Sequence, residues 1–218
     1  MKLLPTGYGI ACLNSEALAS EQSGMSSSVA VVIGFRPDLL QALLQRVADA
    51  ARVSGVFGEV AIVMSGAGAT SSMGGGIVGL PMLRCEARAS AEPAFYAIRA
   101  DVRNANNQQD GVCLWVSLQT GARYLSQSIE ADLMFTGDKI DDLLQEEMVD
   151  LGYNGLALGF EHFRSEDKLY TFRSALGVTQ AQIGSEAGMI AAAKVCEQAL
   201  LGYEAAFREL GNMEASED

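Results

Sequence analysis

A single histidine, His162, limits the catalytic chemistry open to this chain of 218 residues. Zinc sites built on two or three histidines are excluded within one chain, because each histidine would have to be a ligand. A nucleophilic serine or cysteine would need His162 as its base. The chain has no G-x-S-x-G turn, since Val63 stands where Ser65 would need a glycine. We therefore expect a structural role for His162, and we predict no catalytic residue, metal site or cofactor.

The glycine-rich stretch over residues 65–79 raises the question of phosphate binding. It follows an apolar run, as a phosphate-binding loop would, but it lacks the lysine that reaches the phosphates of a nucleotide. A dinucleotide site needs a helix directly after its glycines, whereas extended chain is predicted here. We expect a flexible hairpin tip or a boundary between two subdomains. The alternative is a lid over a small anion, with Gly66, Gly68 and Gly74 as ligand-binding residues.

Arg99 and Arg103 are the candidate residues for holding such an anion. They alternate with apolar residues in a predicted strand with one solvent-facing side, so their side chains share a face. Two guanidinium groups on one face can bind a carboxylate or a phosphate bidentately. The alternative is ion pairing, either with Asp101 or with Glu130 and Asp132 on a neighbouring predicted strand.

Two other segments are candidate surfaces for a partner protein. A predicted helix carries carboxylates on the side away from its leucines, among them Asp141, Asp142 and Glu146. Their spacing is not that of a calcium-binding loop, so a solvated face that a basic partner could dock on is favoured over a metal site. Near the start of the last predicted helix, Gly184 and Gly188 have the spacing of small residues that lets another backbone approach closely.

The charge balance makes another protein the expected partner. The sequence has 27 acidic and 15 basic residues, which gives a formal net charge of -12. Such a chain repels nucleic acid and anionic membranes, because both are bound mainly through Lys and Arg. It attracts basic protein surfaces at long range, although net charge also serves solubility alone. We expect a protein partner with a basic surface and a homo-oligomer, with neither nucleic-acid nor membrane binding.

The four cysteines favour a reducing compartment. They are far apart and lie among apolar neighbours, at positions Cys12, Cys85, Cys113 and Cys196. That pattern suits buried thiols better than a disulfide scaffold or a zinc finger. The apolar run before Pro5 is too short for a signal peptide, and nowhere do 18 apolar residues follow one another as a membrane span requires. We expect a cytoplasmic protein.

The elements that position these groups predict an α+β fold. Apolar or alternating residues predict strands at 29–33, 60–64, 96–103, 112–118, 129–135, 156–163 and 169–175. Helical spacing predicts helices at 37–55, 138–152 and 180–210. Because short polar turns join consecutive strands, we expect a mixed or mainly antiparallel sheet with three main helices packed on it. Thr179 and Gln182 predict a capping box for a long C-terminal helix of about 46 Å.

One α+β domain is expected over residues 29–211, after an N-terminal segment at 1–28 and before a disordered acidic tail at 212–218. From residue 37 onward the order helix, strands, helix, two strands, helix is similar to that of small acidic secretion chaperones. The lack of catalytic groupings, the strong negative charge and the long amphipathic C-terminal helix favour a non-enzymatic protein, expected to be a homodimer, that binds another protein or takes part in an assembly. The alternatives are a protein or enzyme that binds a small anion or nucleotide under the glycine-rich lid, and a phage or virion structural subunit.

Overall fold

The structure is a computed structural model, and the residues that it describes belong to the compact unit Val32–Asp218. They are residues 36–65, 79–88, 90, 92–105, 108–137, 139–155, 157–165 and 167–211, with no side chains described at 102–105 and 108–111. The expectations for 1–28, for the strand at 29–33 and for the tail at 212–218 lie outside these ranges. No helix in the described part of the chain combines the length and the apolar content that crossing a bilayer requires.

The strands within these ranges form one antiparallel sheet. They are β1 (Phe57–Met64), β2 (Pro81–Ala87), β3 (Ala94–Ala105), β4 (Gln108–Thr120), β5 (Phe160–Arg164) and β6 (Tyr170–Ala175). Their order across the sheet is β1-β2-β3-β4-β6-β5. The first four strands pair consecutively, and the β5–β6 hairpin joins the sheet through β6. The predicted α+β fold with a mainly antiparallel sheet is confirmed.

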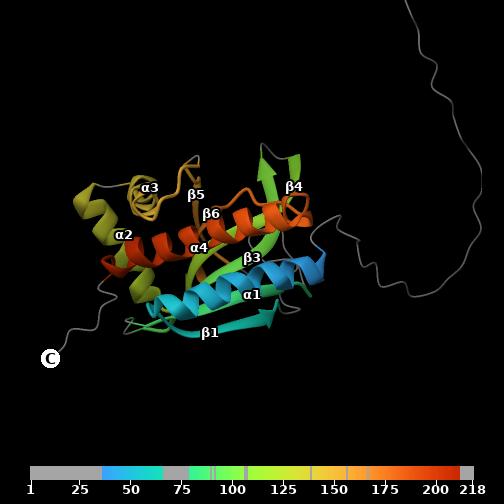
Figure 1. Ribbon diagram of the computed structural model, residues 1–218. Coiled ribbons are helices and arrows are strands. Elements are labelled where there is room, and N and C mark those ends of the chain that lie inside the picture. Colours follow the sequence, from blue (N-terminus) through green and yellow to red (C-terminus); the bar gives the residue numbers. More distant parts are fainter. Residues whose placement is uncertain are drawn as a thin grey trace, which may run out of the picture. The chain divides into compact units, whose positions relative to one another are not determined.

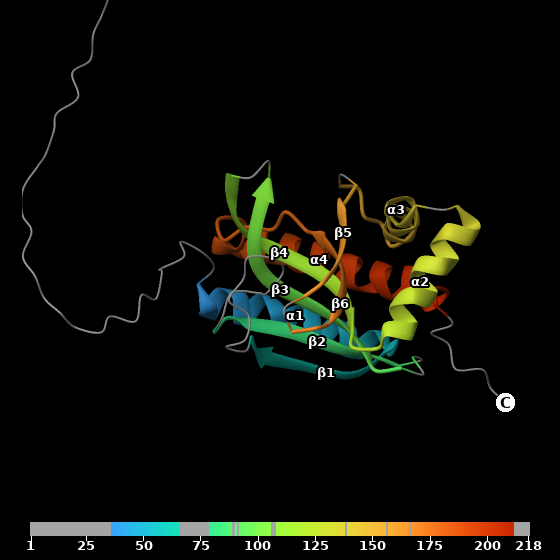
Figure 2. The ribbon, with the colours of Figure 1, turned by 180° about the vertical axis from the view of Figure 1, so that it is seen from behind.

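Helices cover one face of this sheet (Figure 1). The described helices are α1 (Pro37–Ser54), α2 (Arg123–Thr136), α3 (Ile140–Asp150) and α4 (Glu186–Arg208), with a short 3-10 turn, η1 (Gln182–Gly184), before α4. α1 and α4 pack on each other and on the sheet, and α3 packs on α4. Seen from behind, the strands lie in front of α1 and α4, and α2 and α3 lie at one end (Figure 2). The core is therefore the layer between the sheet and the pair α1 and α4.

The predicted α1 is confirmed, and its ends follow the expected chemistry. Pro37 occupies the first turn, where a missing N–H costs no hydrogen bond. Gly55 ends the helix in the left-handed conformation, with φ of 71°. The apolar residues at threes and fours face the sheet and are buried, as with Leu40, Leu44 and Val47.

The predicted strand at 129–135 is wrong, because these residues belong to α2. Alternation over such a short stretch fits either period, and Leu125, Ile129 and Leu133 also recur at the four-residue spacing of a helix. Leu125 and Ile129 are buried, and the N–H of Gly137 closes the helix by donating to the carbonyl of Leu133. Glu130 lies on this helix, as does Asp132. The predicted pairing of these carboxylates with arginines on an adjacent strand is therefore wrong as well.

The C-terminal helix starts later than predicted. The side chain of Gln182 accepts from the N–H of Thr179 at 2.6 Å, as in the expected capping box, but this pair lies at the start of η1 and not at the start of α4. The N-cap of α4 is Ser185, whose hydroxyl accepts from the N–H of Gly188 at 3.1 Å. α4 has 23 residues and is therefore about 35 Å long rather than about 46 Å. It remains the longest helix of the described chain.

The cysteines within the described ranges are Cys85, Cys113 and Cys196, which are buried and form no disulfide with one another. Burial raises the pKa of Cys85 and of Cys196 to about 12, chiefly because a buried thiolate loses its hydration. Both thiols are therefore poor nucleophiles near neutral pH. Cys12 lies outside the described residues.

Candidate functional site

The glycine-rich stretch connects two adjacent strands. β1 and β2 pair with each other up to Met64 and Pro81. Beyond them, the N–H of Ser65 donates to the carbonyl of Leu80 at 3.0 Å, and the N–H of Gly79 donates to the carbonyl of Ser65 at 3.2 Å. The stretch therefore joins two strands of one hairpin. The candidate ligand residues within it lie outside the described residues, at Gly66, Gly68 and Gly74.

The sheet face that α1 and α4 leave uncovered carries a packed layer of polar and aromatic side chains, which we call the Arg173 layer. Arg173 on β6 donates from Nη1 to Oδ2 of Asp101 at 2.8 Å and from Nε to Oε2 of Glu161 at 2.9 Å. Its guanidinium lies 3.9 Å from the ring centroid of Trp115 and 4.8 Å from that of Phe163. Arg173 is only 8% exposed and Asp101 only 3%. This face is therefore not the solvent-facing side that the alternation predicted.

Arg99, the predicted anion ligand, belongs to this layer. Burial lowers the pKa of Arg99, and the negative charge of Asp101 partly offsets that effect. Three carboxylates act on these two arginines: Asp101 and Glu161 pair with Arg173, and the charges of Asp101 and Asp167 act on Arg99. Arg103 lies farther along β3, and its side chain is outside the description. Arg99 therefore lies near the buried ion pair of Arg173 and Asp101.

His162 has the contacts of a structural residue. Its ring stacks on Phe172 at a centroid distance of 4.0 Å and an interplanar angle of 5°. Its Nδ1 lies 3.7 Å from Oε1 of Glu130, so the histidine links β5 to α2. Loss of hydration lowers the pKa of His162, and the nearby carboxylate of Glu130 acts in the opposite direction. The ring is therefore held mainly in its neutral form near pH 7.

Acidification should weaken the fold through His162. Because folding lowers its pKa, the unfolded chain binds the proton more tightly, and stability is lost as pH falls through the unfolded-state pKa of about 6.5. His162→Gln should remove this contribution. Denaturant unfolding should be measured from about pH 8 down to about pH 5. The difference in unfolding free energy between the wild type and the variant should become smaller as the pH falls. A pH-independent difference would contradict the assignment. This is the single histidine of the chain, so its ring NMR signals report the titration directly.

The predicted acidic face on α3 is exposed. Asp141, Asp142 and Glu146 all point to solvent. In the described part of the chain no three His, Cys, Asp or Glu side chains come together as a metal site. Burial raises the pKa of Glu147, and the charges of Asp150 and of other acidic neighbours raise it further. The neighbouring carboxylates therefore act together with burial against ionisation of Glu147.

Gly184 and Gly188 differ in their surroundings. A Cβ on Gly184 would meet nothing within 4 Å, whereas a Cβ on Gly188 would lie 1.8 Å from the carbonyl oxygen of Gln182. The close backbone approach at Gly188 is therefore made by η1 of the same chain. Gly188 also lines a groove of about 550 Å³ whose apolar part includes Val178 and Val195.

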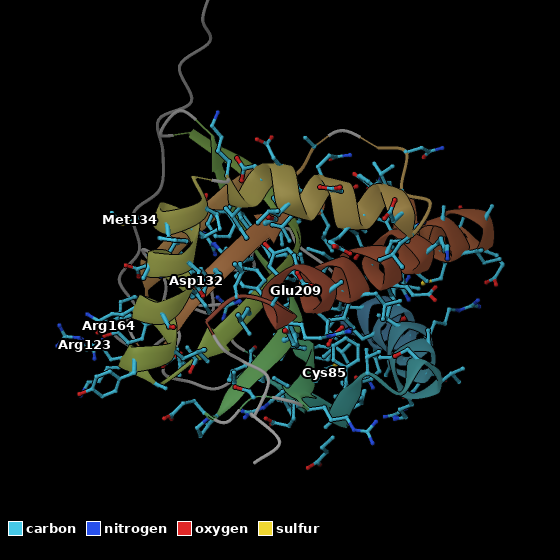
Figure 3. All side chains as sticks on the ribbon, turned by 90° about the vertical axis from the view of Figure 1, so that its left-hand side faces the viewer. Cys85, Arg123, Asp132, Met134, Arg164 and Glu209 are labelled. Carbon is cyan, nitrogen blue, oxygen red and sulfur yellow. The ribbon has the colours of Figure 1, made fainter. Side chains whose placement is uncertain are left out.

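The largest exposed apolar side chains lie on α2. Phe135 is 94% exposed, Met134 84% and Tyr124 82%. They lie on the side away from the buried Leu125 and Ile129, and we call them the α2 stripe. Figure 3 shows Met134 and Arg123 on the outer side of α2 and Asp132 on its inner side. Asp132 accepts there from the N–H of Gly211 at 2.7 Å.

Comparison with protein-family models, with curated proteins and with solved structures finds no match for this chain. The α2 stripe was missed in the sequence because the strand interpretation placed Phe135 beside Ile129 on a buried face. The signal that could have found it is the Leu125, Ile129, Leu133 spacing followed by the helix-ending Gly137.

Proposed function

We propose that this protein binds another protein through the α2 stripe and the acidic face of α3, as a chaperone-like or adaptor protein rather than as an enzyme. The observation that carries the proposal is the exposure of Phe135, Met134 and Tyr124 on one side of one helix. Burying each of them would gain roughly 1.5–3 kcal/mol, so their exposure is costly unless a partner covers them. Exposed apolar groups that gather on one surface mark interaction sites.

The charges beside the stripe favour a basic partner. Asp141 and Asp142 open α3 within seven residues of Phe135, after the short connection at Gly137. Burial raises the pKa of Glu147 on the same helix, and the negative charges of Asp150, Glu209 and Glu146 raise it further. Lysines or arginines on the partner would offset these negative charges and would speed association. An amphipathic segment that pairs apolar residues with Lys or Arg therefore fits this surface.

Affinity capture with matched variants tests the proposal. Phe135→Lys should abolish capture of the partner without loss of stability, because the native side chain is exposed. Val53→Lys is the control, since Val53 on α1 is also an exposed apolar residue. Quantitative mass spectrometry of proteins captured from native lysate should find a partner that wild type and Val53→Lys retain and Phe135→Lys loses.

The charge contribution is tested on the partner found in this way. Asp141→Asn with Asp142→Asn should weaken its binding about tenfold or more, and added salt should weaken the wild-type complex in the same direction. Equal capture by all variants would contradict the proposal. So would a captured partner whose binding responds to neither Phe135 nor the α3 carboxylates.

A further inference from the structure

β1 is the outermost strand of the sheet, and no described strand pairs with its outer edge. Its second half, Val60–Met64, is five consecutive apolar residues. The first four are half-buried and Met64 is 62% exposed. The strand at the opposite end, β5, has Glu161, His162 and Arg164 among its five residues. Charges of that kind keep an edge from pairing with another strand, and the second half of β1 has none among its own residues, although Arg52 of α1 reaches the edge at Val60.

The hydrogen bonds of the hairpin fix which backbone groups point outward. In an antiparallel pair, residues alternate between bonding to the neighbouring strand and facing away from it. Ser65 bonds to β2, and Met64 lies opposite Pro81, which has no N–H to donate. Met64 and Ile62 therefore direct their N–H and C=O groups outward. Val60 agrees with this pattern, because its carbonyl faces outward and accepts from Nη2 of Arg52 at 3.0 Å. A second strand that pairs here must displace this guanidinium or share the carbonyl with it.

The edge strand carries apolar side chains on both sides of the sheet, so a segment that covers this edge must also be apolar on both sides. Val60 and Ile62 lie opposite Cys85 and Leu83 of the core, and Val63 lies opposite Met82 on the other side of the sheet. Only an added strand can cover both faces and bond to the outward backbone groups at once. β1 itself is such a strand.

We infer that β1 pairs antiparallel with β1 of a second copy of this chain, about a two-fold axis at Ile62. That register brings Ile62 opposite Ile62 and Val60 opposite Met64 of the second copy. The outward backbone of Ile62 suits it to the hydrogen-bonded pair at the axis. Glu59 falls opposite Ser65 of the second copy, so no like charges meet along the edge in spite of the net charge of -12. Two six-stranded sheets then become one continuous sheet with an isologous contact.

Disulfide trapping tests the register. Cα atoms of a hydrogen-bonded antiparallel pair are about 5.5 Å apart, which lies within disulfide range. In a Cys12→Ser background, Ile62→Cys should give a covalent dimer under mild oxidation. Glu59→Cys is the matched control, because the two Glu59 positions would lie several residues apart across the axis. A cross-linked dimer from Ile62→Cys alone supports the inference, and equal cross-linking by both variants overturns it.

Proline substitution tests the dimer without relying on cysteine. Met64→Pro removes an outward N–H and should leave the hairpin intact, whereas Val63→Pro removes an N–H that bonds to β2 and should destabilise the fold. Light scattering should show twice the monomer mass for wild type and the monomer for Met64→Pro, while circular dichroism shows that the variant keeps the wild-type fold. The unfolding midpoint of the wild type should rise with protein concentration, and that of Met64→Pro should not. A monomeric wild type at the highest soluble concentration overturns the inference, as does a dimer that survives Met64→Pro. Both readouts are independent of the α2 stripe, so the proposed function and this inference can fail separately.

Discussion

Replacing Arg173 with methionine is expected to lower the free energy of unfolding by about 3 kcal/mol or more. The substitution removes the charge-assisted hydrogen bonds that Arg173 donates to Asp101 and Glu161. Of these two carboxylates, that of Asp101 is almost completely buried. A buried carboxylate that loses its cation retains the cost of its lost hydration. Arg99 remains nearby as a second positive charge, which is why we expect the lower end of the range for a broken buried pair. Stacking on Trp115 is lost as well.

Denaturant unfolding of matched variants measures this effect. Arg46→Met is the control, because the ion pair of Arg46 with Glu186 is solvent-exposed and should be worth about 1 kcal/mol at most. Adding Asp101→Asn to Arg173→Met should recover part of the loss, since it removes the buried charge. A loss for Arg173→Met no larger than that for Arg46→Met would show that the Arg173 layer is not a source of stability.

The elements that the sequence predicted well are those with explicit start and stop residues. α1 has Pro37 at its beginning and Gly55 after its end, and its apolar residues fit only the helical period. α2 has no capping side chain at its start, where Ala122 is the N-cap. Local pattern therefore left two periods open over 129–135. The two-residue period of a strand placed Phe135 on the same face as Ile129, and so in the interior.

The functional surfaces depend on information that no local pattern contains. Asp101 and Arg173 are 72 residues apart in the chain, and only the pairing of β3, β4 and β6 brings them together. Alternation correctly placed Arg99 and Asp101 on one face, but it could not show that Trp115 and its neighbours would shield that face from water. The edge position of β1 likewise follows from strand order, which is a property of the whole sheet.

Gly188→Ala should lower the free energy of unfolding by about 1–3 kcal/mol, whereas Gly184→Ala should change it by roughly 0.5 kcal/mol or less. The Cβ of an alanine at 188 would lie 1.8 Å from the carbonyl oxygen of Gln182 and 3.0 Å from Oγ of Ser185. Relief of that overlap must move η1 away from α4 and disturb the N-cap at Ser185. The higher helix propensity of alanine, about 1 kcal/mol, offsets only part of this cost.

The same pair of variants decides what the two glycines are for. If both had been kept small so that a partner helix could approach, both alanines should weaken partner binding while leaving the unfolding free energy nearly unchanged. The contacts predict instead that Gly188→Ala lowers the unfolding free energy, whereas Gly184→Ala changes neither the unfolding free energy nor partner binding. Thermal or denaturant unfolding, run beside partner capture, separates these outcomes. If both variants were equally stable and lost partner binding equally, this part of α4 would belong to the partner-binding surface. A glycine at 184 would then be needed because the backbone of the partner packs against it.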